Sequence, residues 1–255
     1  MNKKKIRQRD IVTKLKVKEV LTVEEISSLF KITEATVRRD LEDLEREGEI
    51  VRIHGGARIT QEEPSFIKSF KERTENMTLE KERIADRVAE MIPDNTIITL
   101  DNGTTAWLLA KRLKQKQGIT IVTNSLLIIN EMIDTEGINL LITGGTFRKR
   151  NYDFVGEKAV SYLNEIFSDI AVLTCDSFRP GMGFYKLSEA SAEIAKAAVQ
   201  STKKVIVLAD HTKLDSDGFH RFLVPDNVDI LFTDSMISSS NKELISSEPY
   251  QTIYC

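Results

Sequence analysis

The chain has 255 residues, of which 41% are hydrophobic and 29% charged, and its formal net charge is −3. This composition is typical of a globular protein, and the length allows one large domain or a small domain beside a larger one. No apolar run approaches the roughly 18 residues of a membrane span, and the Lys-rich start lacks the apolar stretch of a signal peptide. The two cysteines, Cys175 and Cys255, form no CxxC motif, so we expect a cytoplasmic protein without a disulfide framework or a metal site.

Charge is unevenly distributed along the chain. Residues 1–60 hold 14 Lys and Arg against 11 Asp and Glu, whereas the remaining 195 residues hold 22 against 28. A basic segment on an acidic body is typical of a protein whose one end binds a polyanion. A basic terminus that is merely solvated gives the same numbers, so charge alone leaves both interpretations open.

The first sixty residues predict a helix-turn-helix. Residues 5–16 have a helical pattern. Thr22, with Glu25 three residues later, predicts a capping box at the start of a second, short helix. A third helix, capped by Thr33, ends before Gly48. Two short helices, a tight turn and a third helix make up this motif.

The third helix has two distinct faces. At about 100° per residue, its apolar residues fall on one narrow stripe, formed by Val37, Leu41 and Leu44. The outward face of its N-terminal half is small or cationic, formed by Ala35, Thr36 and Arg39, with Arg38 at its edge. That composition suits a recognition helix, whose first turns enter the major groove, where arginine can bind guanine. In the alternative interpretation, the two arginines are solvated and paired with Glu42 and Asp43.

The stretch "EIVRIHGGARI" (49–59) alternates around two glycines, which predicts a two-stranded hairpin. A hairpin after a recognition helix is the wing of a winged helix, and Arg52, His54 and Arg58 on it would reach phosphates or the minor groove. His54 alternatively only shapes the turn. Because cap, turn, apolar stripe and wing occur in the correct order, we expect DNA binding. The predicted contact residues are Thr22, Thr33, Ala35, Thr36, Arg38, Arg39, Arg52 and His54.

The segment "TVEEISSLFKITEATVRRDLEDLEREGEIVRIHGGA" closely resembles the N-terminal domain of DeoR-type bacterial transcription regulators. "RRDL" and "HGGA" are characteristic of that family and stand intact here at Arg38–Leu41 and His54–Ala57. The resemblance implies a helix-turn-helix from about Val20 to Arg39. We expect a winged helix-turn-helix domain over residues 1–58, a linker over 59–79 and an effector-sensing α/β domain over 80–255.

The larger part of the chain alternates strand and helix patterns. β-Branched apolar runs occupy six segments, 96–100, 119–123, 138–143, 169–174, 204–209 and 229–233. Helical patterns separate the first five, at 105–114, 125–134, 156–166 and 188–201. This alternation predicts an α/β domain with a mostly parallel sheet covered on both faces. Ligands of such sheets bind beyond the carboxyl ends of the strands.

Polar residues follow each of the first five strands. The first strand leads into "DNGTT" (101–105) at the start of a helix, where free amides and two hydroxyls suit an anion such as phosphate. The ends of the later strands carry Asn124, Gly144, Asp176, Asp210 and Lys213. Any one of these is an ordinary cap or turn residue. Their recurrence at one edge predicts a site for a polar, phosphorylated small molecule, with Asp101, Asp176 and Asp210 as acceptors for sugar hydroxyls.

The segments "DNGTT", "VTNS", "ITGGT", "FVGEKA" and "LADHTK" resemble the DeoR-type effector domain, which is related in fold to ribose-5-phosphate isomerase. The resemblance implies that "DNGTT" and Lys213 belong to a sugar-phosphate site, and Glu189 and Lys196 occupy positions that resemble family contacts. After the fourth strand this chain has "TCDS" (174–177) where the family usually has Gly-Ala-Asp-Gly, which leaves the ligand's identity open. The predicted effector-binding residues are Asp101, Gly103, Thr104, Thr105, Asn124, Gly144, Asp176, Glu189 and Lys213.

The sequence therefore predicts a transcriptional regulator of a sugar-utilisation operon. Repression is the usual mode of the family that it resembles. The expected partners are double-stranded operator DNA, a phosphorylated sugar and further copies of the chain in a dimer or tetramer, and no cofactor or catalytic residue is expected. A sugar-phosphate isomerase is the main alternative, because Asp101, Asp176 or Glu189 could act as a base and Lys213 could polarise a carbonyl. A winged helix has no use in such an enzyme. A protein-interaction adaptor leaves the outward Arg39 unexplained.

Overall fold

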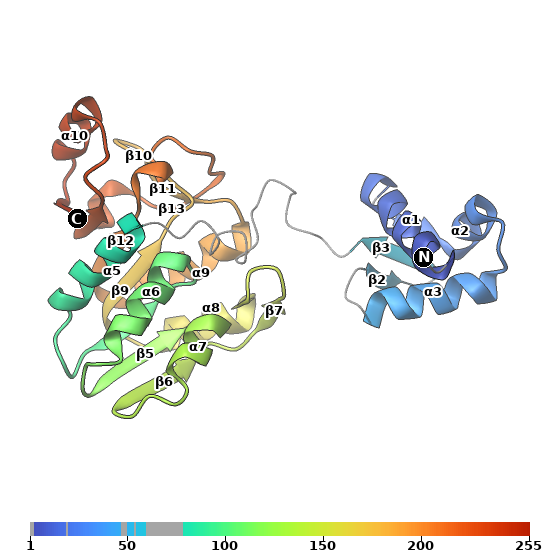
Figure 1. The fold of residues 1–255 in the computed structure, drawn as a ribbon, viewed down its shortest axis with the longest axis horizontal. Helices are drawn as coiled ribbons and strands as arrows, with labels where there is room; N and C mark the ends of the chain where they lie inside the picture. Colours follow the sequence, from blue (N-terminus) through green and yellow to red (C-terminus); the bar gives the residue numbers. More distant parts are fainter. Residues whose placement is uncertain (1–2, 19, 47–49, 54, 60–78) are drawn as a thin grey trace. The chain divides into compact units, whose positions relative to one another are not determined.

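The computed structural model describes residues 3–18, 20–46, 50–53, 55–59 and 79–255. The chain divides into two compact units, Met1–Phe66 and Ile67–Cys255 (Figure 1), and each has a hydrophobic core of its own. The predicted linker over 59–79 lies almost wholly outside the described residues. Its boundaries, and those of the two predicted domains, therefore stay predictions.

The N-terminal unit is a winged helix-turn-helix, as predicted. Its elements are α1 (Lys3–Lys18), β1 (Val20–Thr22), α2 (Val23–Phe30), α3 (Glu34–Arg46), β2 (Ile50–Ile53) and β3 (Gly56–Ile59). The strands form an antiparallel sheet in the order β1-β3-β2, in which β2 and β3 are the predicted hairpin. The helix-turn-helix is formed by α2 and α3.

Local sequence sets the ends of these helices. Thr22 accepts a hydrogen bond from the backbone N–H of Glu25, whose carboxylate accepts one from the N–H of Thr22, so the predicted capping box starts α2. Lys31 ends this helix in the left-handed conformation, with φ 53°, and redirects the chain into α3. The predicted apolar stripe of α3 is buried against α1 and the sheet, in a core that includes Ile11, Leu15, Ile26, Val37, Leu41, Leu44 and Ile50.

The C-terminal unit is built on a seven-stranded parallel sheet in the order β15-β14-β12-β9-β4-β5-β6. Its strands are β4 (Ile97–Leu100), β5 (Ile119–Thr123), β6 (Ile138–Ile142), β9 (Ser168–Thr174), β12 (Thr202–Leu208), β14 (Ile230–Thr233) and β15 (Gln251–Tyr254). The first six lie on the six predicted segments, so the predicted fold class is confirmed. The sequence pattern misses β15, because a four-residue edge strand with polar positions has no extended apolar run.

Helices cover both faces of this sheet (Figure 1). They are α5 (Leu79–Met91), α6 (Thr104–Leu113), α7 (Leu126–Met132), α8 (Glu157–Glu165), α9 (Glu189–Gln200) and α10 (Ser239–Ser246). Successive strand residues point to opposite faces. Val172 therefore packs in the cluster of α5, α6 and α7, whereas Leu173 packs in the cluster that contains α9. Burial on both faces explains why the strands are almost continuously apolar.

Shorter strands and turns lie at the carboxyl edge of the sheet. They are the hairpin β7 (Thr146–Arg148) and β8 (Asp153–Val155), a small antiparallel sheet of β10 (Ser177–Arg179), β11 (Gly183–Lys186) and β13 (His220–Leu223), and the 3-10 turns η1 (His211–Lys213) and η2 (Pro225–Asn227). The sequence pattern does not predict these strands, since each is only three or four residues long.

The strand order determines which loops meet. β4 pairs with β5 on one side and with β9 on the other, and β12 follows β9. The connections that leave β4 and β9 therefore diverge, which makes this point of the sheet a topological switch point, where α/β proteins bind ligands. Three loops gather there, at residues 101–103, 175–176 and 209–213.

Candidate functional site

The predicted recognition helix exposes most of its predicted contact residues. Ala35, Arg38 and Arg39 on α3 are exposed to solvent, whereas Thr36 is half-buried. The hydroxyl of Thr33 accepts a hydrogen bond from the N–H of Thr36 (3.3 Å) and lies 2.9 Å from its hydroxyl, so Thr33 caps the helix. Small and cationic side chains on an exposed N-terminal half are what entry into a major groove requires.

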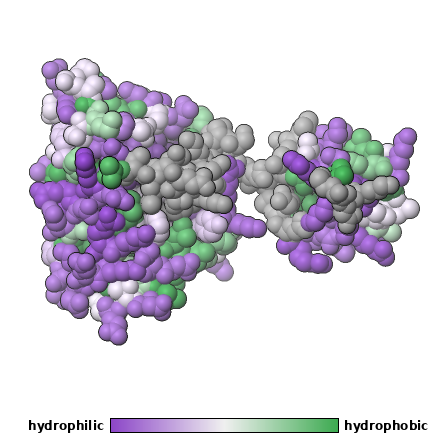
Figure 2. Space-filling view, viewed as in Figure 1, coloured by the Kyte–Doolittle hydropathy of each residue, from purple (hydrophilic) through white to green (hydrophobic). Residues whose placement is uncertain are grey.

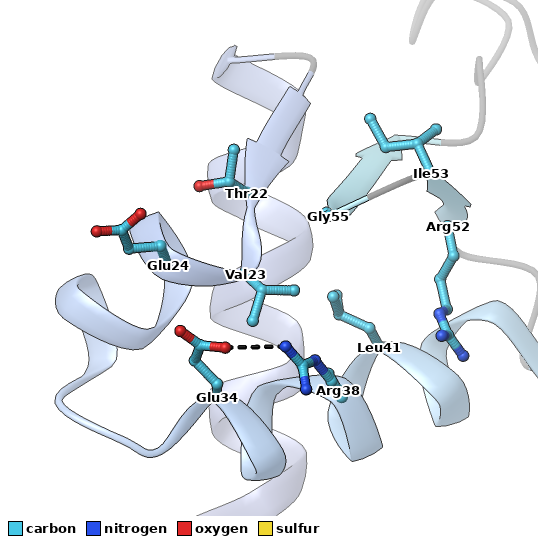
Figure 3. A pocket seen from close by; sticks show the side chains of 10 residues that line it. Thr22, Val23, Glu24, Glu34, Arg38, Leu41, Arg52, Ile53 and Gly55 are labelled. Carbon is cyan, nitrogen blue, oxygen red and sulfur yellow. Dashed lines mark hydrogen bonds and ion pairs between the residues drawn. The ribbon is translucent and has the colours of Figure 1, made fainter.

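A groove of about 530 Å³ lies beside this face, between the start of α2, the helix α3 and the hairpin β2–β3 (Figure 3). Arg38 and Arg52 approach it from α3 and β2. It is lined by Thr22, Val23, Glu24, Glu34, Arg38, Leu41, Arg52, Ile53, Gly55 and Gly56. The groove therefore has a cation on its helix side and another on its hairpin side, an arrangement that suits a phosphate backbone.

The three arginines of this face differ in their partners. Arg38 donates to Glu34 (2.9 Å), one turn earlier on α3, and Arg52 donates to Glu42 (3.3 Å). Arg39 makes no hydrogen bond or ion pair within the part of the chain that the structure describes. The pairing of Arg38 and Arg39 with Glu42 and Asp43, considered as the alternative above, is therefore wrong. Arg39 is the arginine that needs to break no contact before it binds another group.

Two glycines hold the wing against the rest of the unit. The carbonyl of Gly55, whose φ is +78°, accepts a hydrogen bond from the N–H of Val23 at the start of α2 (2.9 Å). A Cβ on Gly56 would lie 2.3 Å from the carbonyl oxygen of Leu21, so only glycine fits there. The "HGGA" segment thus fixes the wing tip beside the helix-turn-helix. His54 lies outside the described residues.

The basic N-terminal segment is partly used inside this unit. Arg7 on α1 forms an ion pair with the buried Asp40 on α3 (2.6 Å), and this hydrogen bond raises the pKa of Arg7. Lys4 pairs with Asp43, and its hydrogen bond lowers the pKa of that carboxyl. These two cations join α1 to α3, so the excess of basic residues is not wholly available to a polyanion.

A second candidate site lies at the switch point of the large sheet. A pocket there is lined by Lys81, Gly103, Thr104, Thr105, Thr174, Cys175, Asp176, Leu208, Asp210 and Lys213. It brings together five of the predicted effector-binding residues, namely Gly103, Thr104, Thr105, Asp176 and Lys213. The pocket combines two lysines with the N-terminus of α6, which are the groups that bind phosphate in proteins.

The start of α6 is arranged as an anion cradle. Gly103 is its N-cap and supplies no side-chain hydrogen bond to the first turn. A Cβ on Gly103 would lie 2.7 Å from Thr174, so glycine allows the loop to pack closely against β9. Thr104 and Thr105 are each only 7% exposed, and among the described residues their hydroxyls have no hydrogen-bond partner. Within the described part of the chain, these two hydroxyls and the uncapped backbone amides of the first turn are therefore available to donate hydrogen bonds to an anion.

Asp101 lies outside this pocket and has a structural role. Its Oδ2 atom accepts hydrogen bonds from the N–H and the hydroxyl of Thr174 (3.0 and 2.9 Å) and from Nζ of Lys186 (2.6 Å). Asp101 and Lys186 are both buried. The predicted role of Asp101 as an acceptor for sugar hydroxyls is therefore not supported by its contacts, which instead join the "DNGTT" loop to β9 and β11.

Three further predicted residues also lie apart from the pocket. Asn124 donates to the carbonyl of Phe154 (3.0 Å) and borders a separate interior void. Gly144 follows β6 with φ +65°, and Glu189 is exposed at the first residue of α9. Lys196 pairs with Glu193 on the same helix. They follow β5 and β6 or begin α9, at the same edge of the sheet, but none of them lines the pocket at the start of α6.

Two lysines of this region were not predicted. Lys81 comes from the first turn of α5, and its Nζ lies 3.9 Å from Oδ2 of Asp210. Lys186 comes from β11, a strand that the sequence pattern does not reveal. Cys175 also lines the pocket, where burial raises its pKa to about 12. Its thiol is therefore protonated at neutral pH and is a poor nucleophile.

The described residues contain no group of three or more His, Cys, Asp or Glu arranged to hold a metal ion. Within that same part of the chain, none of the helices is both long and apolar enough to cross a membrane. Figure 2 shows that hydrophilic residues cover much of the visible surface, with smaller hydrophobic patches between them.

Comparison with known proteins identifies both units. Residues 7–63 match the DeoR-like helix-turn-helix domain, and residues 76–235 match the DeoR C terminal sensor domain. Among solved structures, ribose 5-phosphate isomerase A from Methanocaldococcus jannaschii is similar over 52% of this chain and 53% of its own, at 19% identity and a TM-score of 0.39. A likeness of that size supports no statement about activity.

Relatives along the full length are transcription regulators. The chain is 31% identical to the uncharacterized HTH-type transcriptional regulator YulB of Bacillus subtilis (strain 168), over 95% of this chain and 93% of that protein. It is 32% identical to the transcriptional repressor AccR of Agrobacterium fabrum, over 90% and 89%. It is 26% identical to the glycerol-3-phosphate regulon repressor of Escherichia coli (strain K12), over 98% of both chains. The chain belongs to the DeoR family of helix-turn-helix transcription regulators.

Proposed function

We propose that this protein represses a sugar-metabolism operon and that a phosphorylated sugar, bound at the start of α6, changes its affinity for operator DNA. The observation that carries the effector part is the pocket in which Thr104, Thr105, Lys81 and Lys213 meet an uncapped helix N-terminus. The relatives support the repressor part, since two of them are named as repressors, and one of these two is the repressor of a glycerol-3-phosphate regulon.

The phosphate would lie on the first turn of α6. There the backbone amides and the hydroxyls of Thr104 and Thr105 would donate hydrogen bonds, and the two lysines would neutralise its charge. Asp176, on the rim of the same pocket, has one oxygen engaged by the N–H of Leu187 (2.9 Å) and can accept hydrogen bonds from sugar hydroxyls through the other. This assigns the phosphate to the α6 end of the pocket and the sugar to the β9 end.

The DNA would be bound by α3 and the wing. Arg39 would read a base in the major groove, while Arg38 and Arg52 would contact phosphates on either side of the groove between α3 and β2. Two or four copies of the chain would present paired winged helices to repeated half-sites. The paired winged helices would have two arrangements, of which one fits the operator. The effector changes operator affinity only as far as it binds one arrangement more tightly than the other.

Catalysis is not part of this proposal. An aldose–ketose isomerase needs a free carboxylate base beside the sugar, but Asp101 is occupied by Lys186 and Thr174, and Glu189 does not border the pocket. Asp176 is the one predicted base that does border it. Incubation of the purified protein with ribose 5-phosphate, followed by assay for the ketose product, tests this point, and turnover that is lost in Asp176→Asn would establish an enzyme.

Isothermal titration calorimetry tests the pocket directly. Sugar phosphates are titrated into the wild-type protein beside the same sugars without phosphate. The proposal predicts saturable binding of at least one phosphorylated member and none by its unphosphorylated counterpart. Equal binding of both forms would place the recognition elsewhere on the sugar and would contradict a phosphate cradle at α6.

A further inference from the structure

Lys81 lines the pocket from the first turn of α5. This helix begins at Leu79 and is the first described element of the C-terminal unit in chain order. The side chain of Lys81 is only 11% exposed and lines the pocket at the start of α6. A buried lysine of this pocket thus lies in the described turn of the C-terminal unit that comes next in the chain after the DNA-binding unit.

Asp210 links this lysine to the other cation of the pocket. One carboxylate oxygen, Oδ1, accepts hydrogen bonds from the N–H of Thr212 (3.0 Å) and from its hydroxyl, and so caps η1, the turn that carries Lys213. The other oxygen, Oδ2, lies 3.9 Å from Nζ of Lys81. Direct charge-assisted hydrogen bonds are shorter, about 2.7–2.9 Å, so Lys81 and Asp210 attract each other without a close contact in this structure.

A phosphate on the first turn of α6 would compete with Asp210 for Lys81. The phosphate group offers up to two negative charges, and the pocket that holds it is lined by Lys81 and Lys213 together. Asp210 keeps the hydrogen bonds of its other oxygen to η1 when Lys81 turns away from it. The exchange therefore changes the position of Lys81 while it leaves the turn that holds Lys213 in place.

Apolar packing holds the middle of α5 more firmly than the start of its first turn. Ile84, Ala85 and Val88 are fully buried in the core of the C-terminal unit, which fixes the middle of the helix. Leu79, in contrast, is 66% exposed, so its apolar side chain does little to hold the first turn of the helix in place. Elements with few buried apolar contacts are the ones that shift or unfold locally at low cost.

We propose that Lys81 couples the two units: when it binds the effector phosphate it fixes the first turn of α5, the described element of the C-terminal unit that follows the DNA-binding unit in the chain. This inference rests on the proposed function, because it requires a phosphorylated effector in the pocket. It assigns different tasks to the two lysines. Lys213 supplies affinity for the phosphate, whereas Lys81 converts occupancy into a change of operator affinity.

The test separates ligand affinity from coupling in Lys81→Met and Lys213→Met. The ligand is whichever of ribose 5-phosphate, fructose 6-phosphate and glycerol 3-phosphate the wild-type protein binds most tightly by calorimetry. The operator is a duplex selected in vitro for binding to the wild-type protein. Operator Kd is measured by fluorescence anisotropy at constant ionic strength, without ligand and with each variant saturated. Coupling is the ratio of these two values, which for allosteric proteins is typically about 5- to 150-fold.

In the wild-type protein and in Lys213→Met, we expect the same coupling ratio once ligand is saturating, although Lys213→Met needs at least tenfold more ligand. In Lys81→Met we expect a ratio within about twofold of unity at saturation. Lys158→Met, a change of an exposed lysine on α8, controls for the loss of one charge. Lys81→Arg, which keeps the charge, should restore part of the ratio. Lys81→Gln, which removes the charge, serves as the test variant if Lys81→Met does not fold.

A wild-type ratio in saturated Lys81→Met would overturn the coupling role of Lys81 and leave the proposed function standing. If Lys81→Met does not fold, a wild-type ratio in saturated Lys81→Gln would do the same. A wild-type protein that binds operator and ligand with a ratio of one would overturn both proposals. A protein that binds none of the three phosphates would do so too.

Discussion

Nη2 of Arg38 donates a hydrogen bond to Oε2 of Glu34, 2.9 Å away and one turn earlier on α3. Both side chains are exposed, and both line the groove between α3 and the wing. An exposed pair of this kind contributes only about 0.3–0.5 kcal/mol to a helix. A DNA phosphate can therefore replace Glu34 as the partner of Arg38, but the Glu34 carboxylate then lies beside a polyanion.

This pair predicts that Glu34→Gln strengthens DNA binding. The change frees Arg38 and removes a negative charge from the DNA-facing side, so we expect roughly two- to tenfold tighter binding to specific and non-specific duplexes alike. Anisotropy titrations at two salt concentrations measure it. Glu90→Gln, which breaks the comparable pair with Arg87 in the other unit, is the control. Unchanged or weaker binding by Glu34→Gln would mean that this end of α3 does not approach DNA.

Arg39→Ala should weaken operator binding and relax its sequence preference. Because Arg39 is exposed and unpaired among the described residues, its loss should cost no stability but about 1–3 kcal/mol of discrimination at one base pair. Binding to a panel of single-base operator variants measures the loss. Arg46→Ala, in the last turn of α3, removes the same charge from the other end of the helix. A uniform loss at all sequences would show that Arg39 contacts phosphate rather than a base.

Thr105→Val and Lys213→Ala should weaken effector binding without affecting DNA binding in the absence of effector. Valine keeps the shape of threonine but removes the hydroxyl, which has no hydrogen-bond partner among the described residues. A hydrogen bond to a charged group contributes roughly 1.5–3 kcal/mol, so ligand Kd should rise at least tenfold. Calorimetry measures it, and Thr135→Val, on the loop after α7, is the matched control. Loss of DNA binding in either variant would indicate damage to the fold.

The buried pair Asp101–Lys186 predicts an effect on stability. Both residues are about 95% buried. Lys186→Met leaves the Asp101 carboxylate without its cation and should lower the free energy of unfolding by about 3–5 kcal/mol. The double variant Asp101→Asn/Lys186→Met removes both charges and should recover a large part of that loss. Urea unfolding measures both, and a double variant less stable than Lys186→Met alone would argue against an ion pair.

Asp169 predicts a pH-dependent contribution. A hydrogen bond from Lys203 (2.7 Å), and then one from the N–H of Ile97 (3.0 Å), lower its pKa below the ordinary 3.8. A carboxyl with a lowered pKa in the folded protein stabilises it above the unfolded pKa, and this stabilisation is lost as the pH falls through the folded pKa.

Asp169→Asn should therefore be less stable than the wild-type protein at pH 7, by less than about 1 kcal/mol because the pair is partly exposed. The difference should shrink as the pH falls below 3.8. Urea unfolding of both proteins across this range measures it. Asp134→Asn, an exposed aspartate in a loop, should show no such trend. A difference that is constant with pH would exclude a charge effect.

The sequence was sufficient for the features that depend on local pattern. The capping box of Thr22, the buried stripe of α3 and the six apolar strands each follow from the spacing of a few residues, and all are present in the structure. The cradle residues Gly103, Thr104 and Thr105 lie in one loop, so their proximity also follows from the sequence.

What the sequence could not predict depends on contacts between distant segments. Lys186 reaches Asp101 from a four-residue strand in a separate small sheet, and no local pattern marks that strand. Lys81 lies in "LEKER", where its neighbours indicate a solvated helix face, yet the packing of α5 brings it into the pocket. Asn124 and Glu189 show the opposite error, in which the sequence predicts a contact that the structure lacks. Asn124 follows β5 and Glu189 begins α9, so both lie at the same edge of the sheet, yet neither lines the pocket.

Fluorescence anisotropy tests the proposed repressor function most directly. DNA from upstream of this protein's own gene is titrated with protein at fixed salt and then with phosphorylated sugars. Salt is held constant because phosphate contacts make affinity strongly salt-dependent. We expect sequence-selective binding that one phosphorylated sugar changes at least fivefold and that its unphosphorylated form leaves unchanged. Selective binding that no phosphorylated sugar alters would contradict the assigned role of the α6 pocket, and binding to all duplexes with equal affinity would contradict the role of Arg39.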